Sequence, residues 1–402
     1  MTSEWHEVSL RELVGYMSKG IAPSYAEEAS ETTIRVLNQK CNRNFRISYG
    51  DSRLHDTLKK KVPPERYVKP DDILINSTGA GTAGRIAQIE DVPSATTIDG
   101  HMILIRSNGK VTQKFLGYAL KAHQWEVLQL DEGSTGQTEL NRDRLLDEIM
   151  INYPVSFDEQ NAIVGTLESI DRKLVVNEQL NDNLEQQISA LFINMFGFNI
   201  DNLVDNKFSL GDLVESVDNR GKTPPLSDKP TSYPIIDVKA LSGDIRIVDY
   251  NNCTKYVDEE TYNNWFRSGH PKQYDILIST VGSLAEMKIF LGDIGCIAQN
   301  VVGFRSKGVS PLYLYQYLNY IKSDLVAYNI GSVQPSIKVT HIIKHPIYVA
   351  PQDELDKFDS VARSITEKIF ANCQENESLK LLRDTLLPKL MSGELDVSDI
   401  DL

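Results

Sequence analysis

The sequence contains one long internal repeat, and this repeat constrains the fold more than any other feature. Residues 72–79 (DILINSTG) return as residues 275–282 (DILISTVG), roughly half a chain length later. Residues 98–109 (IDGHMILIRSNG) return in the same way as residues 297–308 (IAQNVVGFRSKG). This period is far longer than the unit of a solenoid repeat protein, and each copy is the size of a domain. The repeat therefore predicts two similar domains, and such a chain can approach a partner that is itself nearly two-fold symmetric.

The chain length and composition agree with this organisation. A chain of 402 residues is long enough for two or three domains, and its hydrophobic content of 41% is ordinary for globular cores. The net charge of −14 argues against a free-standing nucleic-acid-binding protein, because such proteins are usually basic. An acidic total still leaves room for a local basic surface or for a basic partner.

The sequence lacks the patterns that direct proteins to membranes or to the secretory pathway. It has no run of about 18 apolar residues that could span a membrane, and its first residues, MTSEWHEVSL, do not form a signal peptide. The cysteines form no CxxC pair and no metal-binding spacing, so we expect reduced thiols in a cytoplasmic protein. The cysteines are Cys41, Cys253, Cys296 and Cys373.

Each copy of the repeat begins with a strand-rich part. Residues 72–76 and 102–106 are short, apolar and rich in β-branched side chains, and polar or Gly-rich turns bound them. We expect short helices at residues 113–128 and 311–328, so each part should be a mixed, β-rich domain with long loops. The strand-like runs of the second copy are residues 233–238, 245–248, 275–279 and 297–304.

Each copy ends with a long helical part. From residue 158 to 196, apolar side chains recur with a seven-residue period, which is typical of a coiled-coil seam. The pattern returns in the second copy, and acidic residues open both helices at the end that favours negative charge. We expect the first helix to end near Phe196, and Pro388 to kink or break the second. Arg383 interrupts the second seam, and we expect it to snorkel to the edge.

Both helices carry a pair of asparagines on the seam. Asn177 and Asn181 in the first helix correspond to Asn372 and Asn376 in the second. These are either tolerated polar layers or pairs that fix the register, since a mismatched amide would lack a hydrogen-bond partner. Two antiparallel helices of about 38 residues, roughly 57 Å long, would hold one β-rich domain at each end. A DNA duplex with two half-sites presents a matching geometry.

Familiar catalytic and cofactor motifs are weak or absent. Residues 79–84 (GAGTAG) match the G-x-G-x-x-G pattern of dinucleotide or S-adenosylmethionine sites, but residues 282–287 of the second copy read GSLAEM. No helix of the βαβ type follows, so we interpret the glycines as a flexible loop near a ligand. The sequence has no (Asp/Asn)-Pro-Pro-aromatic methyltransferase loop and no P-loop. His341 and His345 lack a third ligand nearby, so we expect no metal and no cofactor in this chain.

Basic residues gather in the first copy between residues 35 and 69, with asparagines among them. Lysine and arginine can neutralise DNA phosphates, and arginine, asparagine and glutamine can pair with base edges. The alternative interpretation is a solvated loop without a partner. The second copy has sparser candidates. The two copies differ most in these loops and least in their framework, as one scaffold that reads two different sequences would.

Several segments resemble the specificity subunit of type I restriction–modification enzymes. The most specific likeness is the C-terminal segment 379–395 (LKLLRDTLLPKLMSGEL). Residues 220–225 (RGKTPP), 275–279 (DILIS), 298–301 (AQNV) and 133–137 (GSTGQ) also look like landmarks of the family. The resemblance covers the whole chain.

The resemblance implies an α+β architecture with a pseudo-two-fold internal repeat. Two β-rich target recognition domains, residues 1–157 and 200–351, would be joined by two long conserved helices packed as an antiparallel coiled coil. The first conserved spacer helix would cover residues 158–199. The second, together with the C-terminal tail, would cover residues 352–402.

The resemblance also implies a function. The chain would be the DNA sequence-recognition subunit of a type I restriction–modification complex, reading a split site with one domain per half-site. It would dock two modification (methyltransferase) subunits through its helices, and restriction subunits would add translocation and cleavage. S-adenosylmethionine, ATP and magnesium would bind to these partners, and this chain would not be an enzyme. The alternatives are a coiled-coil interaction scaffold without DNA reading and, less well supported, a self-contained DNA methyltransferase.

We therefore expect the DNA contacts to lie in the loops of both domains. In the first domain the candidates are Arg35, Lys40, Arg43, Asn44, Arg46, Lys59, Lys60, Ser77, Thr78, Arg85 and Gln137. In the second domain they are Arg220, Lys222, Thr223, Lys239, Ser279, Thr280, Lys288 and Gln334.

Overall fold

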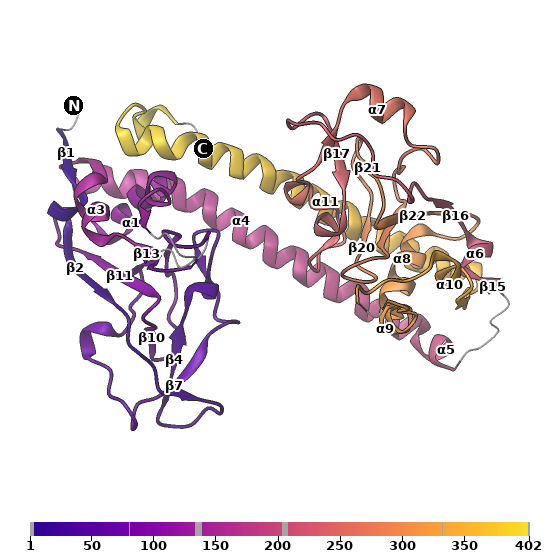
Figure 1. Cartoon of the computed structure of the whole chain (residues 1–402), viewed down its shortest axis with the longest axis horizontal. Helices are drawn as coiled ribbons and strands as arrows, with labels where there is room; N and C mark the ends of the chain where they lie inside the picture. The colour runs from indigo at the N-terminus through magenta and orange to yellow at the C-terminus, as the bar shows by residue number, and fades with distance from the viewer. Residues whose placement is uncertain (1–3, 80, 133–138, 203–207, 332, 401–402) are drawn as a thin grey trace. The chain divides into compact units, whose positions relative to one another are not determined.

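Figure 1 shows the computed structural model of the chain, which divides into two compact units. The first unit contains residues 1–173 and 379–402, and the second contains residues 174–378. No helix in the described part of the chain is long and apolar enough to cross a membrane. The structure describes all residues except 1–3, 80, 133–138, 203–207, 332 and 401–402.

The first unit is built on a four-stranded antiparallel sheet whose central strands are buried on both faces. Alternate residues of a strand point to opposite faces, so Ile73 and Ile75 pack under a helix while Leu74 packs against a second sheet. Burial on both faces explains why this strand is an unbroken apolar run instead of an alternating one. In sheet order the strands are β2 (Val14–Lys19), β11 (Met102–Ser107), β8 (Ile73–Asn76) and β9 (Ile86–Gln88).

Helix α1 (Gln113–Ala122) covers one face of this sheet, and a second four-stranded sheet covers the other. The hydroxyl of Thr112 accepts a hydrogen bond from the N–H of Phe115 and so caps the start of α1. In the second sheet, β4 runs parallel to β10 and antiparallel to β7. The strands of this sheet, in order, are β10 (Thr96–Ile98), β4 (Thr33–Leu37), β7 (Arg53–Asp56) and β3 (Tyr25–Ala26).

Smaller elements complete the first unit. The strand β1 pairs antiparallel with β14, and this pair leads the chain into the long helix α4 (Phe157–Phe192). These elements are β1 (Trp5–Ser9), β5 (Asn42–Arg43), β6 (Arg46–Ile47), α2 (Gln124–Val127), β12 (Asp131–Glu132), β13 (Glu139–Leu140), α3 (Arg142–Glu148), β14 (Met150–Pro154), and the 3₁₀ turns Leu10–Glu12, Gln39–Cys41 and Pro64–Arg66.

The second unit repeats this topology. Its first sheet has the same connectivity, with Ile276 and Ile278 packed under helix α8 and Leu277 facing the second sheet. In the second sheet β17 runs parallel to β21 and antiparallel to β18, as β4 does with β10 and β7. The first sheet, in order, is β16 (Val214–Val217), β22 (Val301–Ser306), β19 (Ile276–Ser279) and β20 (Met287–Ile289), and the second is β18 (Tyr256–Val257), β17 (Tyr233–Ile236) and β21 (Cys296–Ile297).

Short helices and one further strand pair complete the second unit. The pair of β15 and β23 is antiparallel and precedes the long helix α11 (Gln352–Ser392). These elements are α5 (Phe198–Asp201), β15 (Phe208–Ser209), α6 (Leu210–Leu213), α7 (Glu259–Asn264), α8 (Pro311–Tyr320), α9 (Lys322–Ala327), α10 (Val339–Ile342), β23 (Pro346–Ile347), and the 3₁₀ turns Val238–Leu241 and Tyr250–Asn252.

One ion pair recurs at the same place in both units. Arg106 on β11 donates two hydrogen bonds to the carboxylate of Asp72, each 2.7 Å long. Arg305 on β22 does the same to Asp275, at 3.1 and 2.7 Å. Both carboxylates are almost completely buried, and bidentate geometry gives a buried pair of this kind its strength. The repeated sequence segments therefore form the same buried Arg–Asp ion pair in each unit.

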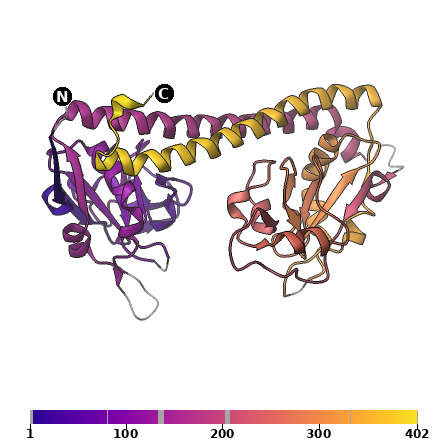
Figure 2. The same cartoon turned by 90° about the horizontal axis from the view of Figure 1, so that it is seen from above.

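The long helices α4 and α11 each contribute one part to each unit. In the first unit, Leu167 of α4 shares a core with Leu390 of α11, and Figures 1 and 2 show these two segments side by side. Pro388 lies inside α11, and the helix runs on to Ser392 without the break that the sequence allowed. Arg383 does not snorkel into solvent, because its guanidinium is largely buried and donates to Asp171 at 3.2 Å.

In the second unit the two helices pair through the four seam asparagines. Nδ2 of Asn177 donates to Oδ1 of Asn376 at 2.9 Å, and Nδ2 of Asn372 donates to Oδ1 of Asn181 at 2.7 Å. Because residue numbers rise along one helix as they fall along the other, these segments run antiparallel. All four side chains are buried. A role in fixing the register requires such amide-to-amide pairing, since a shifted helix would leave the amides unsatisfied.

The first long helix extends beyond the expected end near Phe196. Helix α4 passes at Ile193–Gly197 into a π-helical turn, and α5 follows directly. Phe192 and Phe196 both enter the core of the second unit, and the centre of each ring lies 5.6 Å from that of Phe358. Aromatic packing therefore prolongs this helix where the sequence pattern ends.

Candidate nucleic-acid interface

A tight hairpin in the first unit presents polar side chains to solvent. Arg43 pairs with Arg46 across β5 and β6, so only Asn44 and Phe45 make the turn. Both have positive φ, 53° and 60°, as a two-residue turn of this hand requires. Arg43 and Asn44 are exposed. The hairpin therefore holds a guanidinium and an amide outward, and these two groups can pair with guanine and adenine edges.

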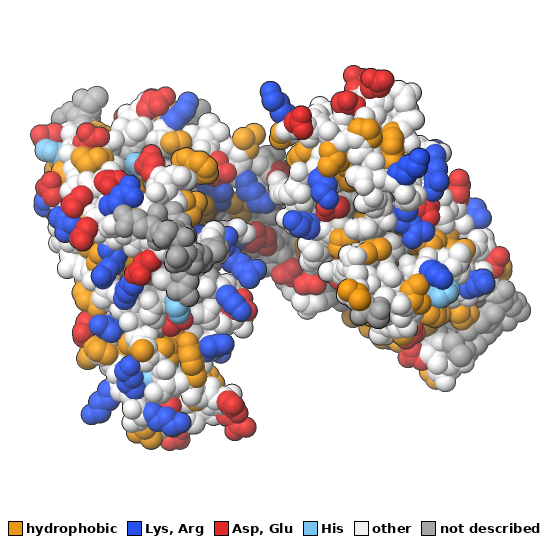
Figure 3. All heavy atoms as spheres, viewed as in Figure 1, with side chains coloured by type: hydrophobic (Ala, Val, Ile, Leu, Met, Phe, Trp, Pro, Cys, Tyr) orange, Lys and Arg blue, Asp and Glu red, His pale blue; other side chains and the backbone are white. Residues whose placement is uncertain are grey.

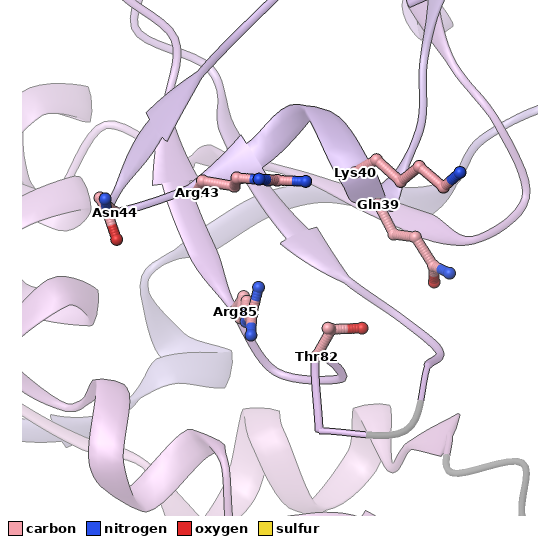
Figure 4. Close-up of a pocket in the computed structure, with 6 residues that line it drawn as sticks. All are labelled: Gln39, Lys40, Arg43, Asn44, Thr82 and Arg85. Atoms are coloured by element: carbon pink, nitrogen blue, oxygen red, sulfur yellow. The ribbon is translucent and has the colours of Figure 1, made fainter. Parts of the chain in front are cut away.

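The hairpin borders a polar hollow of about 540 Å³. Figure 4 shows Arg43 from the hairpin and Arg85 from the turn before β9 on two sides of it. Three of its six lining side chains are cationic and none is acidic, so the hollow suits a polyanion such as the DNA backbone. The lining residues are Gln39, Lys40, Arg43, Asn44, Thr82 and Arg85.

Buried and capping asparagines hold the backbone around this hollow. Asn42 is 1% exposed, and its Nδ2 donates to the Asn76 side chain and to the backbone carbonyl of Arg85 at 2.8 Å. Asn38 caps the following 3₁₀ turn by accepting from the N–H of Lys40 at 2.9 Å. These bonds connect the hairpin to β8 and β9 and set the direction in which Lys40 leaves the backbone.

Gly79 lies at the floor of the same region and cannot be replaced without strain. Its φ is 120°, which other residues rarely adopt, and a Cβ atom there would lie 2.3 Å from Oγ1 of Thr82 and 2.8 Å from Oε1 of Gln39. Within the described part of the chain, neither of these two buried oxygens has a hydrogen-bond partner. Native proteins contain few such unsatisfied groups. The turn at Gly79 therefore brings two unpaired oxygens together below the surface of the hollow, where a ligand does not reach them in this conformation.

The remaining basic candidates of the first domain lie outside the hollow. Arg35 is exposed on β4 and donates to the Ser52 hydroxyl at 2.9 Å, whereas Lys60 donates to the carbonyl of Ala22 at 2.8 Å. Lys59 lies 3.8 Å from the carboxylate of Asp56. Figure 3 shows Lys and Arg side chains spread over the part of this domain that contains β4 and β7. This basic surface can contribute phosphate contacts around the hollow.

The loop after β8 divides into accessible and buried positions. Thr78 is partly exposed, and its hydroxyl lies 2.7 Å from Nδ1 of His101. Ser77 is 0% exposed, so its hydroxyl does not face solvent in this structure, and a contact with DNA at this residue remains a prediction. Ser77 follows the last residue of β8, and its side chain has no exposed surface. The candidate Gln137 lies outside the described residues.

In the second unit, the segment from Asp218 to Thr223, which follows β16, forms a polar surface. Arg220 is half-buried and donates two hydrogen bonds to the Asp218 carboxylate, at 2.9 and 2.7 Å, which holds the pKa of that carboxyl below its ordinary value. Lys222 and Thr223 are exposed. The side chain of Gln299, on a loop with φ of 44°, donates to the Thr223 hydroxyl. Two loops distant in sequence thus meet at this surface.

Lys40 and Lys239 occupy matching positions in the two units. Each is the second residue of a 3₁₀ turn that follows the central strand of the second sheet, β4 or β17. Asp237 caps its turn by accepting from the N–H of Lys239 at 3.0 Å, as Asn38 does for Lys40. Both lysines are exposed. The structure therefore brings one cation to the same edge of each domain.

Three candidates of the second domain are buried and do not face a ligand. Lys288 is 1% exposed, and its ammonium donates to the backbone carbonyls of Gly243 and Ile245, while burial lowers its pKa. Ser279 and Thr280 are 0% exposed. The structure gives these three residues contacts inside the domain and does not present them to a ligand, so DNA contacts at them remain predictions that the structure does not support.

Gln334 is exposed next to the loop that follows β19. The backbone carbonyl of Pro335 accepts a hydrogen bond from Gly282 at 3.0 Å, and Val281 forms a bridge with Ser336. This contact places the Gln334 segment beside the loop after β19. Gln334 thus remains accessible to a ligand.

The glycine-rich segment 79–84 does not form a dinucleotide site. The segment connects β8 to β9, which are antiparallel neighbours, whereas the dinucleotide motif connects a strand to a helix. Among the described residues, no group of three or more His, Cys, Asp or Glu side chains could hold a metal ion.

Sequence reasoning missed Gln39, Thr82 and Gln299. Gln39 lies between Asn38 and Lys40, and its amide could have been recognised with the interleaved asparagines. Thr82 lies inside the glycine-rich segment, whose spacing was the available signal for a close backbone turn. Gln299 belongs to a repeated segment, yet only the folded chain brings it to Thr223.

A comparison with known protein families finds the same domain twice in this chain. The family model described as "Type I restriction modification DNA specificity domain" matches residues 2–186 and, a second time, residues 205–372. The chain belongs to this family. This type I specificity protein thus has two target recognition domains, one in each compact unit, and the repeat in its sequence is the repeat of that domain.

Individual relatives agree with the family. The specificity subunit of the type I restriction enzyme MjaIX from Methanocaldococcus jannaschii is 26% identical over 375 residues, which cover 88% of this chain and 84% of the relative. The crystal structure of a type I restriction–modification S subunit from M. genitalium is 16% identical and covers 97% of this chain and 96% of that one, with a TM-score of 0.56. The HsdS subunit from Thermoanaerobacter tengcongensis is 14% identical, with coverage of 97% for both chains and a TM-score of 0.37. The M. genitalium structure supports the fold.

Proposed function

We propose that this type I specificity protein reads a split DNA site, with one target recognition domain on each half-site. The observation that carries this proposal is the hollow of the first domain, which combines Lys40, Arg43 and Arg85 with the amides of Gln39 and Asn44. Cations bind phosphates, while arginine and amide side chains discriminate base edges. A solvated loop without a partner does not explain why cations from two distant segments of the chain, residues 40–43 and Arg85, gather at one hollow.

The second domain would read the other half-site with a different set of side chains. Lys239 matches Lys40, whereas Arg220, Thr223 and Gln299 have no counterpart in the hairpin of the first domain. A shared cation at the edge of each domain suits a phosphate contact, which carries no sequence information. Different loop residues suit different base sequences.

We further propose that α4 and α11 bind two methyltransferase subunits. On the part of α4 in the second unit, Val176 and Leu180 are exposed to 50% and 36%. They are four residues apart and therefore lie on one face of the helix. On the part of α11 in the first unit, Leu381 is 72% exposed. Exposed apolar side chains on a helix are typical of surfaces that bind a partner.

The chemistry would belong to the partners. S-adenosylmethionine would bind to the methyltransferase subunits, and ATP and magnesium would bind to restriction subunits, so that this chain orients DNA and itself transfers no group. Its negative net charge fits such a division, because partner subunits can supply the rest of a positive DNA clamp. We expect the complex to work in the cytoplasm, where the chromosome is.

A genome-wide map of methylated adenines tests this function. We would compare cells that make the chain together with its methyltransferase partner, cells that make the partner alone, and cells with an Arg43→Ala chain. A split motif that is present in the first cells and lost in the second supports the proposal. If the pattern is unchanged without this chain while the partner is expressed, the chain is a scaffold and does not read DNA.

A further inference from the structure

Phe45 has a backbone conformation that a bulky side chain rarely adopts. Its φ is 60°, and it follows Asn44 in the two-residue turn of the hairpin. Asparagine tolerates this left-handed region, whereas an aromatic residue there is strained. Strain of this kind persists only where neighbouring contacts hold the residue in place, and it gathers at functional sites.

Lys121 of α1 provides such a contact. Its Nζ atom lies 5.1 Å from the centre of the Phe45 ring and 5.3 Å from that of Tyr118, within the range of cation–π attraction. The same atom donates to Oδ2 of Asp171 on α4 at 2.8 Å. Only 11% of the Lys121 side chain is exposed, so water screens these contacts weakly.

Asp171 is the point at which the first domain and the two helices meet within the first unit. Its carboxylate also accepts a hydrogen bond from the Tyr118 hydroxyl at 3.0 Å and from Arg383 of α11 at 3.2 Å. Three donors, two from α1 and one from α11, therefore converge on one carboxylate. The hairpin is connected to this group through Phe45 and Lys121.

In the second unit, the segment that contains Arg246 is bound to α4 directly, without an intervening residue. Arg246 donates to both carboxylate oxygens of Glu185 on α4, at 3.0 and 2.7 Å, and to the Thr366 hydroxyl of α11 at 2.9 Å. The two segments correspond because each follows the 3₁₀ turn after the central strand of the second sheet and then forms a bridge with the last strand of the first sheet. In the first unit Phe45 bridges to Ala87 of β9, and in the second Ile247 bridges to Ile289 of β20.

We propose that Lys121 and Arg246 are positioning residues for DNA recognition, because each holds the reading segment of its domain on an acidic residue of α4. The first reading segment is residues 39–47. The second is residues 238–247, which carries Lys239 but not the other proposed contacts of that domain, Arg220, Thr223 and Gln299. Contacts to base edges require side chains positioned to within a fraction of an ångström, and two-residue strands cannot provide this precision alone. The inference rests on the proposed function, since it takes these segments to be the ones that read DNA.

The substitution Lys121→Met tests this role in the assembled complex of the full chain with its methyltransferase partner. Met keeps the apolar stem over Phe45 but removes the charge. The matched control is Lys114→Met, because Lys114 also lies on α1 and pairs with an acid on α4, Glu168, at 2.7 Å. The cation–π pairs found among the described residues include Lys121 but not Lys114.

The measurement is the methylation rate on duplexes with the mapped site and on duplexes with one base changed in either half-site. For Lys121→Met we expect the selectivity at one half-site to fall about ten-fold, with the other half-site unchanged. Lys114→Met should leave both unchanged, and Lys121→Arg should restore selectivity, because it keeps the charge. A general loss of stability would affect both half-sites alike, so the second half-site is an internal control.

Equal losses at both half-sites, or equal behaviour of Lys121→Met and Lys114→Met, would overturn the inference. Phe45→Gly provides a second test that does not alter the buried charge, since glycine adopts the turn freely but lacks the ring. It should lower selectivity at the same half-site, and unchanged selectivity would also overturn the inference. A wild-type complex that methylates without sequence preference would instead contradict the proposed function itself.

Discussion

Arg246 and Glu185 form an ion pair in which the guanidinium has no exposed surface at all. A charge without water must have its hydrogen bonds completed by protein groups. Here both carboxylate oxygens of Glu185 and the Thr366 hydroxyl accept from the guanidinium. The pair joins the second target recognition domain to α4 and α11 within one unit.

Removing one partner of this pair should therefore be costly. We expect Glu185→Gln to lower the free energy of unfolding by about 3 kcal/mol, because a buried guanidinium would lose its counter-charge. The measurement is urea denaturation of the purified chain. Asp182→Asn is the control, since Asp182 is exposed on the same helix and should change stability little. If the two variants have the same stability, the ion pair does not hold this unit together.

Because the seam asparagines form hydrogen-bonded pairs, we expect substitutions at two paired asparagines to have non-additive effects on the free energy of unfolding. Asn177→Leu should destabilise the second unit by about 1–3 kcal/mol, because it leaves the buried amide of Asn376 without its partner. The double variant Asn177→Leu, Asn376→Leu should recover most of this loss, since both polar groups are then gone. A double-mutant cycle measures the coupling. Strictly additive effects would mean that the two amides do not act as a pair.

Asp171 predicts a pH dependence with a definite sign. Burial opposes ionisation of this carboxyl, but Lys121 and Arg383 outweigh it and lower its pKa from 3.8. A carboxyl whose pKa is lower in the folded chain than in the unfolded chain stabilises the fold. This stabilisation is complete at a pH above the pKa of the unfolded chain, and it is lost as the pH falls through the pKa of the folded chain. Wild-type chain should therefore be more stable than Asp171→Asn at neutral pH, and the difference should shrink below about pH 4. A difference that stays constant between neutral pH and pH 3 would contradict this account.

Gly79 predicts a position-specific effect of adding one methyl group. Gly79→Ala would bring a Cβ atom to 2.3 Å from Oγ1 of Thr82 at a φ of 120°, so the turn beside the hollow must shift. We expect a loss of stability of about 1–2 kcal/mol and weaker binding at the first half-site. Gly81→Ala is the matched control, because Gly81 also has positive φ but open space around it. Equal effects on DNA binding would mean that the shape of this turn is unimportant.

Lys40 and Arg43 should affect DNA binding in different ways. Lys40→Ala should weaken binding to all sequences alike and reduce the salt dependence by about one unit of slope, as expected for one lost phosphate contact. Arg43→Ala should relax one base position of the site, at a cost of about 1–3 kcal/mol for the preferred base. Binding titrations of the assembled complex at several salt concentrations separate the two. If Arg43→Ala changes neither affinity nor sequence preference, its assignment is wrong.

Much of the fold could be predicted from the sequence because its pattern is local and periodic. The seven-residue spacing predicts α4 and α11, and the seam asparagines fall on the positions that pair in the second unit. The end of the first helix could not be predicted in this way, because Phe192 and Phe196 are held by aromatic rings from distant segments.

The candidate site was predicted less completely, because residue type does not report burial. Lys288 has the chemistry of a phosphate contact, yet its ammonium is enclosed by backbone carbonyls. Ser279 is the last residue of the repeated strand β19 and is completely buried. Gln39 was overlooked among more obvious cations, although it lines the same hollow as Arg43.

The sequence by itself determined the two-domain repeat, the long helices and the family, because repeats, periodicity and motifs are properties of the order of residues. Only the tertiary structure decided which polar groups meet. Lys121 and Phe45 are far apart in the chain, and the ion pair of Arg246 with Glu185 joins a loop to a helix. Such contacts arise when packed layers exclude water, and packing depends on all elements of a unit at once.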